Sequence, residues 1–223
     1  MTFRARAFVW SIALPLLVTA CSRPAPPASP AASSNDAAFT DLARTYLADL
    51  YQRRPTVATF LGIHRFDDRL ESYSRQAVQD EAAFARDVRG RVAAIDPATL
   101  NPSNQLDREQ LLRAIDSRLL TLDVIRPWAK DADTYSSGLT NTAYLMIKRN
   151  FAPAEERLRN LIAREKAMPA ALAEARNNLD APPRIYTEIA IEQIDGNRDF
   201  FATAVAAAFP TVTDAALLKE FKQ

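Results

Sequence analysis

Glycine is scarce in this sequence, and its scarcity restricts the fold. Only four glycines occur in 223 residues, whereas tight β-hairpins depend on glycine for backbone conformations with a positive φ angle. Alanine, leucine, arginine and glutamate, which favour helices, are abundant instead. We therefore expect an all-α chain, folded as an irregular array of about seven to nine helices.

Histidine occurs once, as His64, and this limits both catalysis and metal binding. A helical zinc hydrolase needs two histidines four residues apart with a glutamate between them, because one helical turn then presents both imidazoles to the metal. Serine-hydrolase chemistry would also need His64 as its base, and the Gly-x-Ser-x-Gly elbow is missing. Asp67 and Asp68 are too few for a carboxylate site of the kind that calcium prefers. We interpret His64 as a structural residue of a polar loop, with a metal ligand or a substrate contact in a cleft as the alternative.

Cysteine also occurs once, and charge of either sign is not in excess. The single Cys21 excludes an internal disulfide and a zinc site built from several cysteines. Lysine and arginine number 28 against 27 acidic residues, so the net charge is only +1. Nucleic-acid-binding proteins usually carry a clear basic excess. We therefore expect no nucleic-acid partner.

The apolar run near the N-terminus is too short to cross a bilayer as a helix. It extends over 7–20, about 14 residues, against the ~20 that a spanning helix needs. Arg4 and Arg6 precede it, and small residues lead up to Cys21. Residues 1–20 therefore have the pattern of a signal peptide.

The end of this segment also suggests a membrane anchor. Residues 18–21, Val-Thr-Ala-Cys, resemble the lipobox of bacterial lipoproteins, in which the cysteine becomes the lipidated first residue of the mature chain. Lipidation of Cys21 is our expectation, and an ordinary signal peptide with an incidental cysteine is the alternative. By resemblance to the sorting pattern of such lipoproteins, Ser22 in place of aspartate implies the periplasmic face of the outer membrane. Residues 21–36, which contain four prolines, are predicted to be an extended tether.

A helical domain is expected over residues 37–223. Apolar residues recur every three or four positions in 74–95 and 103–125, which predicts two long helices packed as an antiparallel pair. A further helix is predicted at 184–209. The residues of that helix that we expect in the core are Ile185, Ile189, Ile194, Phe201, Val205 and Phe209.

Prolines and the chain end set other expected boundaries. Pro153 and Pro169 each predict the start of a new helix, because proline favours the first helical turn and lacks the N–H needed further along. Two short helices joined at a bend should result. Thr213 or Asp214 can cap a final helix, but only about ten residues remain before the end at Gln223, fewer than the ~12–15 that an isolated helix needs. We expect a truncated product, with a frayed natural terminus as the alternative.

Two sets of charged residues are candidates for function. Glu188 lies one helical turn after Arg184, so it is either a catalytic carboxylate or, as we prefer, a partner of Arg184 in an exposed ion pair. Four arginines close in sequence could form a surface for carboxylate ligands, or they could simply lie on solvated helix faces. These are Arg149, Arg157, Arg159 and Arg164.

Four ordered segments together resemble the bacterial "domain of unknown function 885" (DUF885) proteins. They are RPTVATFLGIHRFDDRLESYS, IDPATLNPSNQLDREQLL, RNFAPAEERLRNLIAREKAMPAALAEARNNL and PPRIYTEIAIEQIDG. The resemblance implies an envelope lipoprotein placed among zincin-like metallopeptidases, of which this chain is the N-terminal half. It aligns Gly62, His64 and the following Asp67 with the family's loop, and Glu188 with a later Pro-Pro segment. None of these four residues is a metal ligand of the family.

The resemblance also implies what the chain can do alone. In the family a later segment with His-Glu-x-x-His is expected to bind zinc and cleave peptide-like bonds, and that segment is missing here. We therefore expect no cofactor, no catalytic residue and no metal ligand in this chain. In an intact family member we expect zinc and a peptide substrate. The alternative is a non-enzymatic helical envelope lipoprotein that binds a protein or peptide partner.

Overall fold

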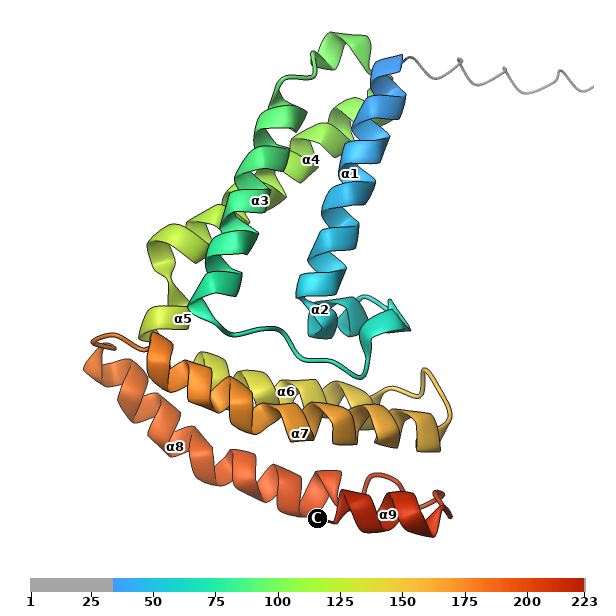
Figure 1. Cartoon of the computed structure of the whole chain (residues 1–223), viewed down its shortest axis with the longest axis vertical. Coiled ribbons are helices and arrows are strands. Elements are labelled where there is room, and N and C mark those ends of the chain that lie inside the picture. The colour runs from blue at the N-terminus through green and yellow to red at the C-terminus, as the bar shows by residue number, and fades with distance from the viewer. Residues whose placement is uncertain (1–33, 223) are drawn as a thin grey trace, which may run out of the picture. The chain divides into compact units, whose positions relative to one another are not determined.

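The computed structural model describes residues 34–222, and every regular element in this part is a helix (Figure 1). The all-α prediction is therefore confirmed. The α-helices are α1 (Ser34–Arg53), α2 (Pro55–Phe60), α3 (Arg75–Ala93), α4 (Pro102–Leu119), α5 (Pro127–Lys130), α6 (Asp133–Lys148), α7 (Ala154–Asn178), α8 (Arg184–Phe200) and α9 (Ala215–Phe221). Short 3-10 helices, η1 (His64–Phe66) and η2 (Pro97–Thr99), and π-helices, η3 (Leu120–Ile125) and η4 (Phe201–Val205), lie between them.

The predicted signal peptide and Cys21 lie outside the described residues. Helix α1 begins at Ser34, within the range 21–36 expected for the tether. None of the helices in residues 34–222 has both the length and the hydrophobicity that crossing a bilayer requires.

Helices α1, α3 and α4 pack together around one hydrophobic core. The predicted pairing of the two long helices is confirmed, because α3 and α4 contact each other and α1 packs against both (Figure 1). Ser74 and Asn101 cap the two helices, each side chain accepting a hydrogen bond from a first-turn N–H. The buried residues of this core are Phe39, Leu42, Tyr46, Ala85, Val88, Val92, Leu100 and Ile115.

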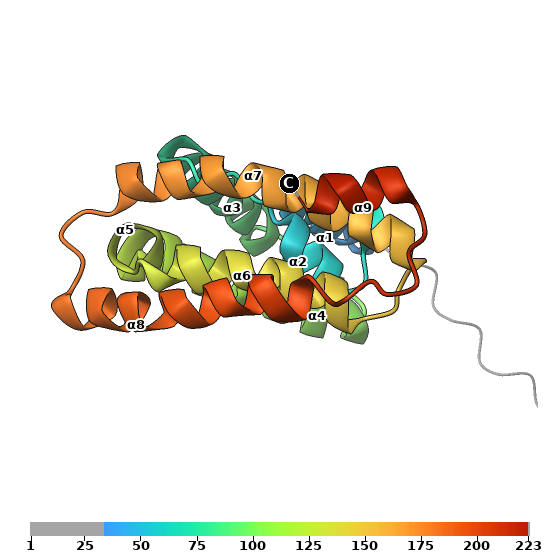
Figure 2. The same ribbon diagram turned by 90° about the horizontal axis from the view of Figure 1, so that it is seen from below.

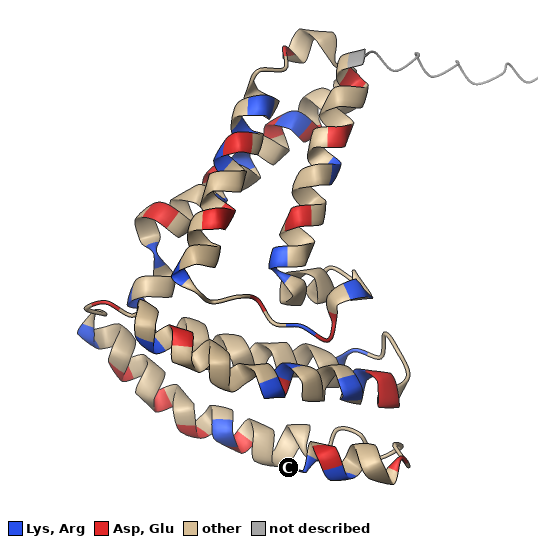
Figure 3. Ribbon diagram, in the orientation of Figure 1, with Lys and Arg blue, Asp and Glu red and all other residues tan. Residues whose placement is uncertain are grey.

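Helices α6 to α9 surround a second core. Helix α6 contacts both α7 and α8, and α9 packs on α7 (Figure 2). Asp214 caps α9 as predicted, accepting from the N–H groups of Ala216 and Leu217. The buried residues here are Ala143, Met146, Leu158, Leu161, Ile162, Val205, Phe209, Val212 and Leu217. Acidic and basic residues are interspersed along the helices around both cores (Figure 3).

The prediction that Pro169 starts a new helix is wrong. Helix α7 runs without a break from Ala154 to Asn178 and contains Pro169. An internal proline costs a helix about 3 kcal/mol, but α7 buries side chains on both sides of it, from Leu158 to Ala175, and Pro169 itself is exposed. Packing along the whole helix therefore outweighs the local break.

The predicted core residues of α8 are also partly wrong. Ile185, Ile189 and Ile194 are 56%, 42% and 45% exposed, although Val205 and Phe209 are buried as expected. The only residue of α8 that is buried is Ala190, because α8 packs on α6 through a narrow strip. These isoleucines do not share one face of α8, because Ile185 and Ile194 are nine positions apart and so point to opposite sides of the helix.

Candidate functional site

The candidate site forms where the loop between α2 and α3 folds back on α2. Gly62 makes this possible with φ +85°, a conformation that costs a side-chain-bearing residue energy. Its N–H donates to the carbonyl of Thr59 at 3.1 Å, and the next N–H, of Ile63, donates to Ala58 at 2.8 Å. A Cβ at Gly62 would meet nothing within 4 Å, so glycine is needed for the backbone angle and not for space. The turn places His64 and Asp67 beside α2.

His64 is held from two sides. Its Nδ1 lies 2.9 Å from Oδ2 of Asp67, and its ring stacks on Phe151 with centroids 4.1 Å apart and planes 9° from parallel. The His64 side chain is 36% exposed, whereas that of Asp67 is 3% exposed. Phe151 belongs to the connection between α6 and α7. The stack therefore joins the loop to the second group of helices.

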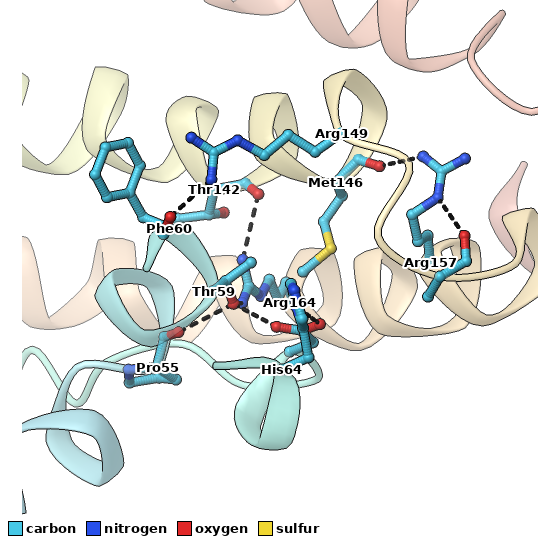
Figure 4. A network of polar contacts seen from close by, with 11 residues as sticks. Pro55, Thr59, Phe60, His64, Thr142, Met146, Arg149, Arg157 and Arg164 are labelled. Carbon is cyan, nitrogen blue, oxygen red and sulfur yellow. Dashed lines mark hydrogen bonds and ion pairs between the residues drawn. The ribbon is translucent and has the colours of Figure 1, made fainter. Parts of the chain in front are cut away.

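Behind His64, the buried Thr59 bonds to Arg164 of α7 (Figure 4). The same threonine bonds to Asp67. The hydroxyl of Thr59 accepts a hydrogen bond from Nη2 of Arg164 at 2.6 Å and lies 2.5 Å from Oδ1 of Asp67. The same hydroxyl is 3.1 Å from the carbonyl of Pro55. Because a hydroxyl has one proton to donate, the closer and charged carboxylate receives it.

Arg164 is fully buried, which is unusual for a charged residue. Its Nη1 donates to the carbonyl of Thr142 in α6 at 3.3 Å, while its Nε has no partner within the described residues. Burial lowers the pKa of Arg164, and the carboxylates of Asp67 and Glu71 oppose that change. The guanidinium therefore remains a buried cation whose counter-charges come from the loop between α2 and α3.

The four arginines considered from the sequence do not form one surface. Arg157 is buried like Arg164, with 6% of its surface exposed. It donates to the carbonyls of Met146 at 2.6 Å and Ala152 at 3.1 Å. Arg149 is exposed and donates to the carbonyl of Phe60 at 2.7 Å (Figure 4). Arg159 lies 3.8 Å from both Glu155 and Asp214. The four arginines therefore form neither a single ligand surface nor a purely solvated helix face, because Arg157 and Arg164 are buried and bond to backbone carbonyls.

The structure brings three of the predicted residues together and leaves the fourth elsewhere. Gly62, His64 and Asp67 share the loop, whereas Glu188 lies on α8 with an oxygen 2.7 Å from Nε of Arg184. This pair is exposed, at 90% for Arg184 and 46% for Glu188, which agrees with the preferred interpretation of an ion pair.

Sequence reasoning missed Thr59, Phe151 and the burial of Arg164. One signal was available for the arginine, because Arg164 follows the buried Leu161 by three positions and so lies on the same face of the helix. A charged residue in an apolar stripe indicates a buried partner. Nothing in the local pattern indicated which residue that partner would be.

A cavity of about 340 Å³ lies next to this network. It is lined by Arg54, Glu71, Tyr73, Trp128 and Tyr135, among others. Burial raises the pKa of Tyr73, with Glu71 adding to the effect. At one side, the buried Asn178 of α7 donates to the Tyr73 carbonyl at 2.5 Å and to the Tyr135 hydroxyl at 3.1 Å. Asn178 thus ties α7 to the loop that precedes α3.

The donor groups of the site do not fit a catalytic zinc ion. Nδ1 of His64 is engaged by Asp67, and Oδ1 of Asp67 is engaged by Thr59. In residues 34–222, no three His, Cys, Asp or Glu side chains are close enough to hold a metal ion. The hydroxyl of Thr59 is 1% exposed and cannot reach a substrate. The arrangement therefore joins the loop, α2, α6 and α7, and presents only the imidazole of His64 at the surface.

Comparison with known proteins gives two findings. The family described as "Bacterial protein of unknown function (DUF885)" matches residues 55–223, which include the whole His64 network. A solved structure of a candidate lipoprotein of unknown function from Shewanella oneidensis is similar, with a TM-score of 0.72 and 26% sequence identity. The similarity covers 86% of this chain but 34% of that one, so this chain spans about a third of the neighbour's length. No curated protein matches the chain.

Proposed function

The chain belongs to the DUF885 family of bacterial proteins, and from this membership we propose that it is the amino-terminal helical part of a lipid-anchored protein of the bacterial cell envelope. The candidate lipoprotein from Shewanella oneidensis supports the envelope location. The lipobox-like residues before Cys21 supply the point of attachment.

In the intact protein, this part forms one wall of a peptide-binding cleft and supplies no zinc ligand. The zinc and the reaction of a zincin-like metallopeptidase belong to a further segment with His-Glu-x-x-His. The observation that carries this proposal is the extent of the structural match, since this chain corresponds to a third of its neighbour. The His64 network agrees with it, because its polar groups hold helices together and leave no set of metal donors.

The second candidate is a non-enzymatic envelope lipoprotein that binds a protein or peptide partner. The exposed isoleucines of α8 favour it, because Ile185, Ile191 and Ile194 are 56%, 62% and 45% exposed. Exposed apolar groups gathered on one helix usually mark a contact surface.

One experiment separates the two candidates. The reading frame is followed past the codon for Gln223 to its stop codon, and the encoded protein is purified and analysed for bound metal and peptide hydrolysis. A downstream His-Glu-x-x-His, one zinc per chain and chelator-sensitive hydrolysis support the peptidase. A reading frame without that motif and a protein without zinc contradict it and favour the binding protein.

A variant within this chain serves as the control. His64→Gln removes the single imidazole but should leave the zinc content of the intact protein unchanged, because His64 is engaged by Asp67 and Phe151. Loss of zinc from this variant, with the fold intact by circular dichroism, would mean that His64 is a ligand after all.

Membrane attachment is tested separately at the N-terminus. Cys21→Ser should shift the protein from the membrane fraction to the soluble fraction, since stable anchoring needs the acyl chains. Ser22→Asp should keep the protein on membranes but move it from the outer to the inner membrane in a density gradient. Unchanged partition of Cys21→Ser would refute lipidation.

A further inference from the structure

Next to Arg164 on α7, Glu165 lines a different part of the molecule. It borders a cavity of about 300 Å³ between α7, the π-helix η4 and α9. The other side chains of this cavity are mostly apolar and aromatic: Phe201, Val205, Phe209, Leu218 and Phe221, with Lys222 at one side. This cavity is distinct from the His64 network, because Arg164 bonds to Thr59 and Thr142 on α2 and α6.

The carboxylate of Glu165 has no counter-charge in the described part of the chain. No hydrogen bond or ion pair to it forms within residues 34–222. On α7 and α9 the nearby ions are engaged elsewhere, because Lys166 pairs with Glu220, and Arg159 lies near Glu155 and Asp214. Lys222 is exposed and forms no ion pair with another residue of 34–222, and η4 carries no charged residue.

The ionised form of the half-buried Glu165 is unfavourable in these surroundings. Burial raises the pKa of Glu165 to about 7, since the ionised form loses its hydration and gains no partner. Near neutral pH, a cation that entered the cavity would therefore find a poorly solvated anion ready to pair with it.

We propose that the cavity bordered by Glu165 is a binding site for a small organic ammonium ion that carries an apolar chain. The carboxylate supplies the counter-charge, and the rings of Phe201, Phe209 and Phe221 supply an apolar wall. Aromatic faces attract cations within about 6 Å of the ring centroid. One of these rings already does so, because the guanidinium of Arg157 lies 5.5 Å from the centroid of Phe209. A volume of about 300 Å³ is at the lower end of small-ligand sites.

The same features select against other ligands. An anion would be repelled by Glu165, and a neutral molecule with the same tail would leave the charge of the carboxylate without a counter-charge. Among residues 34–222, Lys222 is the one cationic residue that lines the cavity, so it competes with the ligand for Glu165. Its removal should strengthen binding.

Isothermal titration calorimetry tests the proposal on the protein expressed from its complete reading frame. Hexylammonium is titrated at pH 8, with hexanol and hexanoate as probes of equal tail length. We expect saturable binding of one hexylammonium per chain, at least tenfold weaker binding of hexanol, and none of hexanoate. Lowering the pH to 6 should weaken hexylammonium binding about tenfold, because a carboxyl of pKa about 7 is then mostly protonated.

Two variants connect the binding to this cavity. Glu165→Gln removes a poorly solvated charge, so it should fold at least as well as the wild type and bind hexylammonium at least tenfold more weakly. Glu156→Gln removes an exposed charge from the same helix and should bind as the wild type does. Lys222→Met should bind more tightly. Equal binding by Glu165→Gln and the wild type, equal affinity for hexanol and hexylammonium, or no saturable binding would each overturn the proposal.

Discussion

Nη2 of Arg164 and the hydroxyl of Thr59 lie 2.6 Å apart in the interior, although 105 positions separate the two residues in the sequence. Asp67 completes the set from the other side of the hydroxyl, at 2.5 Å. The guanidinium and the carboxylate form no direct ion pair, so the threonine hydroxyl is the group that connects the two charges. Its removal should therefore affect both of them.

Thr59→Val should destabilise the protein by about 3 kcal/mol, because it leaves a buried cation and a buried carboxylate without their shared partner. Thr59→Ser retains the hydroxyl and should cost less than about 1 kcal/mol. As a matched control, Thr45→Val changes an exposed threonine of α1 whose hydroxyl bonds only to the carbonyl of Asp41, and should cost less than about 0.5 kcal/mol. Unfolding in urea measures all three, and equal costs for residues 59 and 45 would show that the connection contributes nothing.

Two glycines should respond in opposite directions to the same substitution. Gly62→Ala should destabilise the protein by about 1 kcal/mol, because φ at residue 62 is +85° and a Cβ is strained there. Gly196→Ala should stabilise it by about 0.5–1 kcal/mol, since residue 196 lies inside α8. Neither new Cβ would meet an atom within 4 Å, so packing does not enter the comparison. A stabilising Gly62→Ala, again by urea unfolding, would contradict the backbone argument.

Stability should depend on pH through Glu165. Its pKa rises from 4.5 to about 7 on folding, so between these values the folded state binds a proton that the unfolded state has lost. The free energy of unfolding therefore falls as the pH rises from 4.5 to 7, and levels off above. Glu165→Gln should equal the wild type at pH 4 and be about 2 kcal/mol more stable at pH 8, which is less than the whole pKa change would give because Glu165 is only partly buried. Thermal unfolding across this range is the measurement, and a difference that did not change with pH would contradict it.

Two ion pairs of different burial should differ in strength. Arg118 of α4 donates twice to Glu81 of α3, at 2.5 and 2.8 Å, with side chains 22% and 15% exposed. Glu81→Gln should cost about 1–2 kcal/mol, because it weakens two charge-assisted hydrogen bonds. Glu109→Gln is the control, since Glu109 and Arg113 are 59% and 74% exposed, and it should cost less than about 0.5 kcal/mol. Equal costs would show that burial does not strengthen the α3–α4 pair.

The helices that the sequence predicted well are those with local signals. Ser74, Asn101 and Asp214 each cap a helix through their own side chains, and the chemistry of a cap involves only the next three residues. The errors at Pro169 and in α8 have the opposite origin. A proline inside α7 and exposed isoleucines on α8 are decided by which helices pack on which, and periodicity within one helix carries no information on its neighbours.

In the candidate site, too, the sequence indicated the residues that are close along the chain and missed those that are distant. Resemblance to a family pointed to Gly62, His64 and Asp67, which are close in the sequence and share one loop. Arg164 and Phe151 could not be assigned to this loop, because they reach it only after α6 and α7 have packed against α2. Arg164 is 105 positions from Thr59, its partner in α2, and such a separation exceeds the range of any local pattern.

The contact between His64 and Asp67 settles where the imidazole carries its proton when it is neutral. An ionised carboxylate only accepts hydrogen bonds, so Nδ1 must be the protonated nitrogen, and Nε2 keeps its lone pair. Because the ring also stacks on Phe151, the lone pair of Nε2 has a fixed direction. While the imidazole is neutral, any group that approached Nε2 would therefore meet a hydrogen-bond acceptor and not a donor.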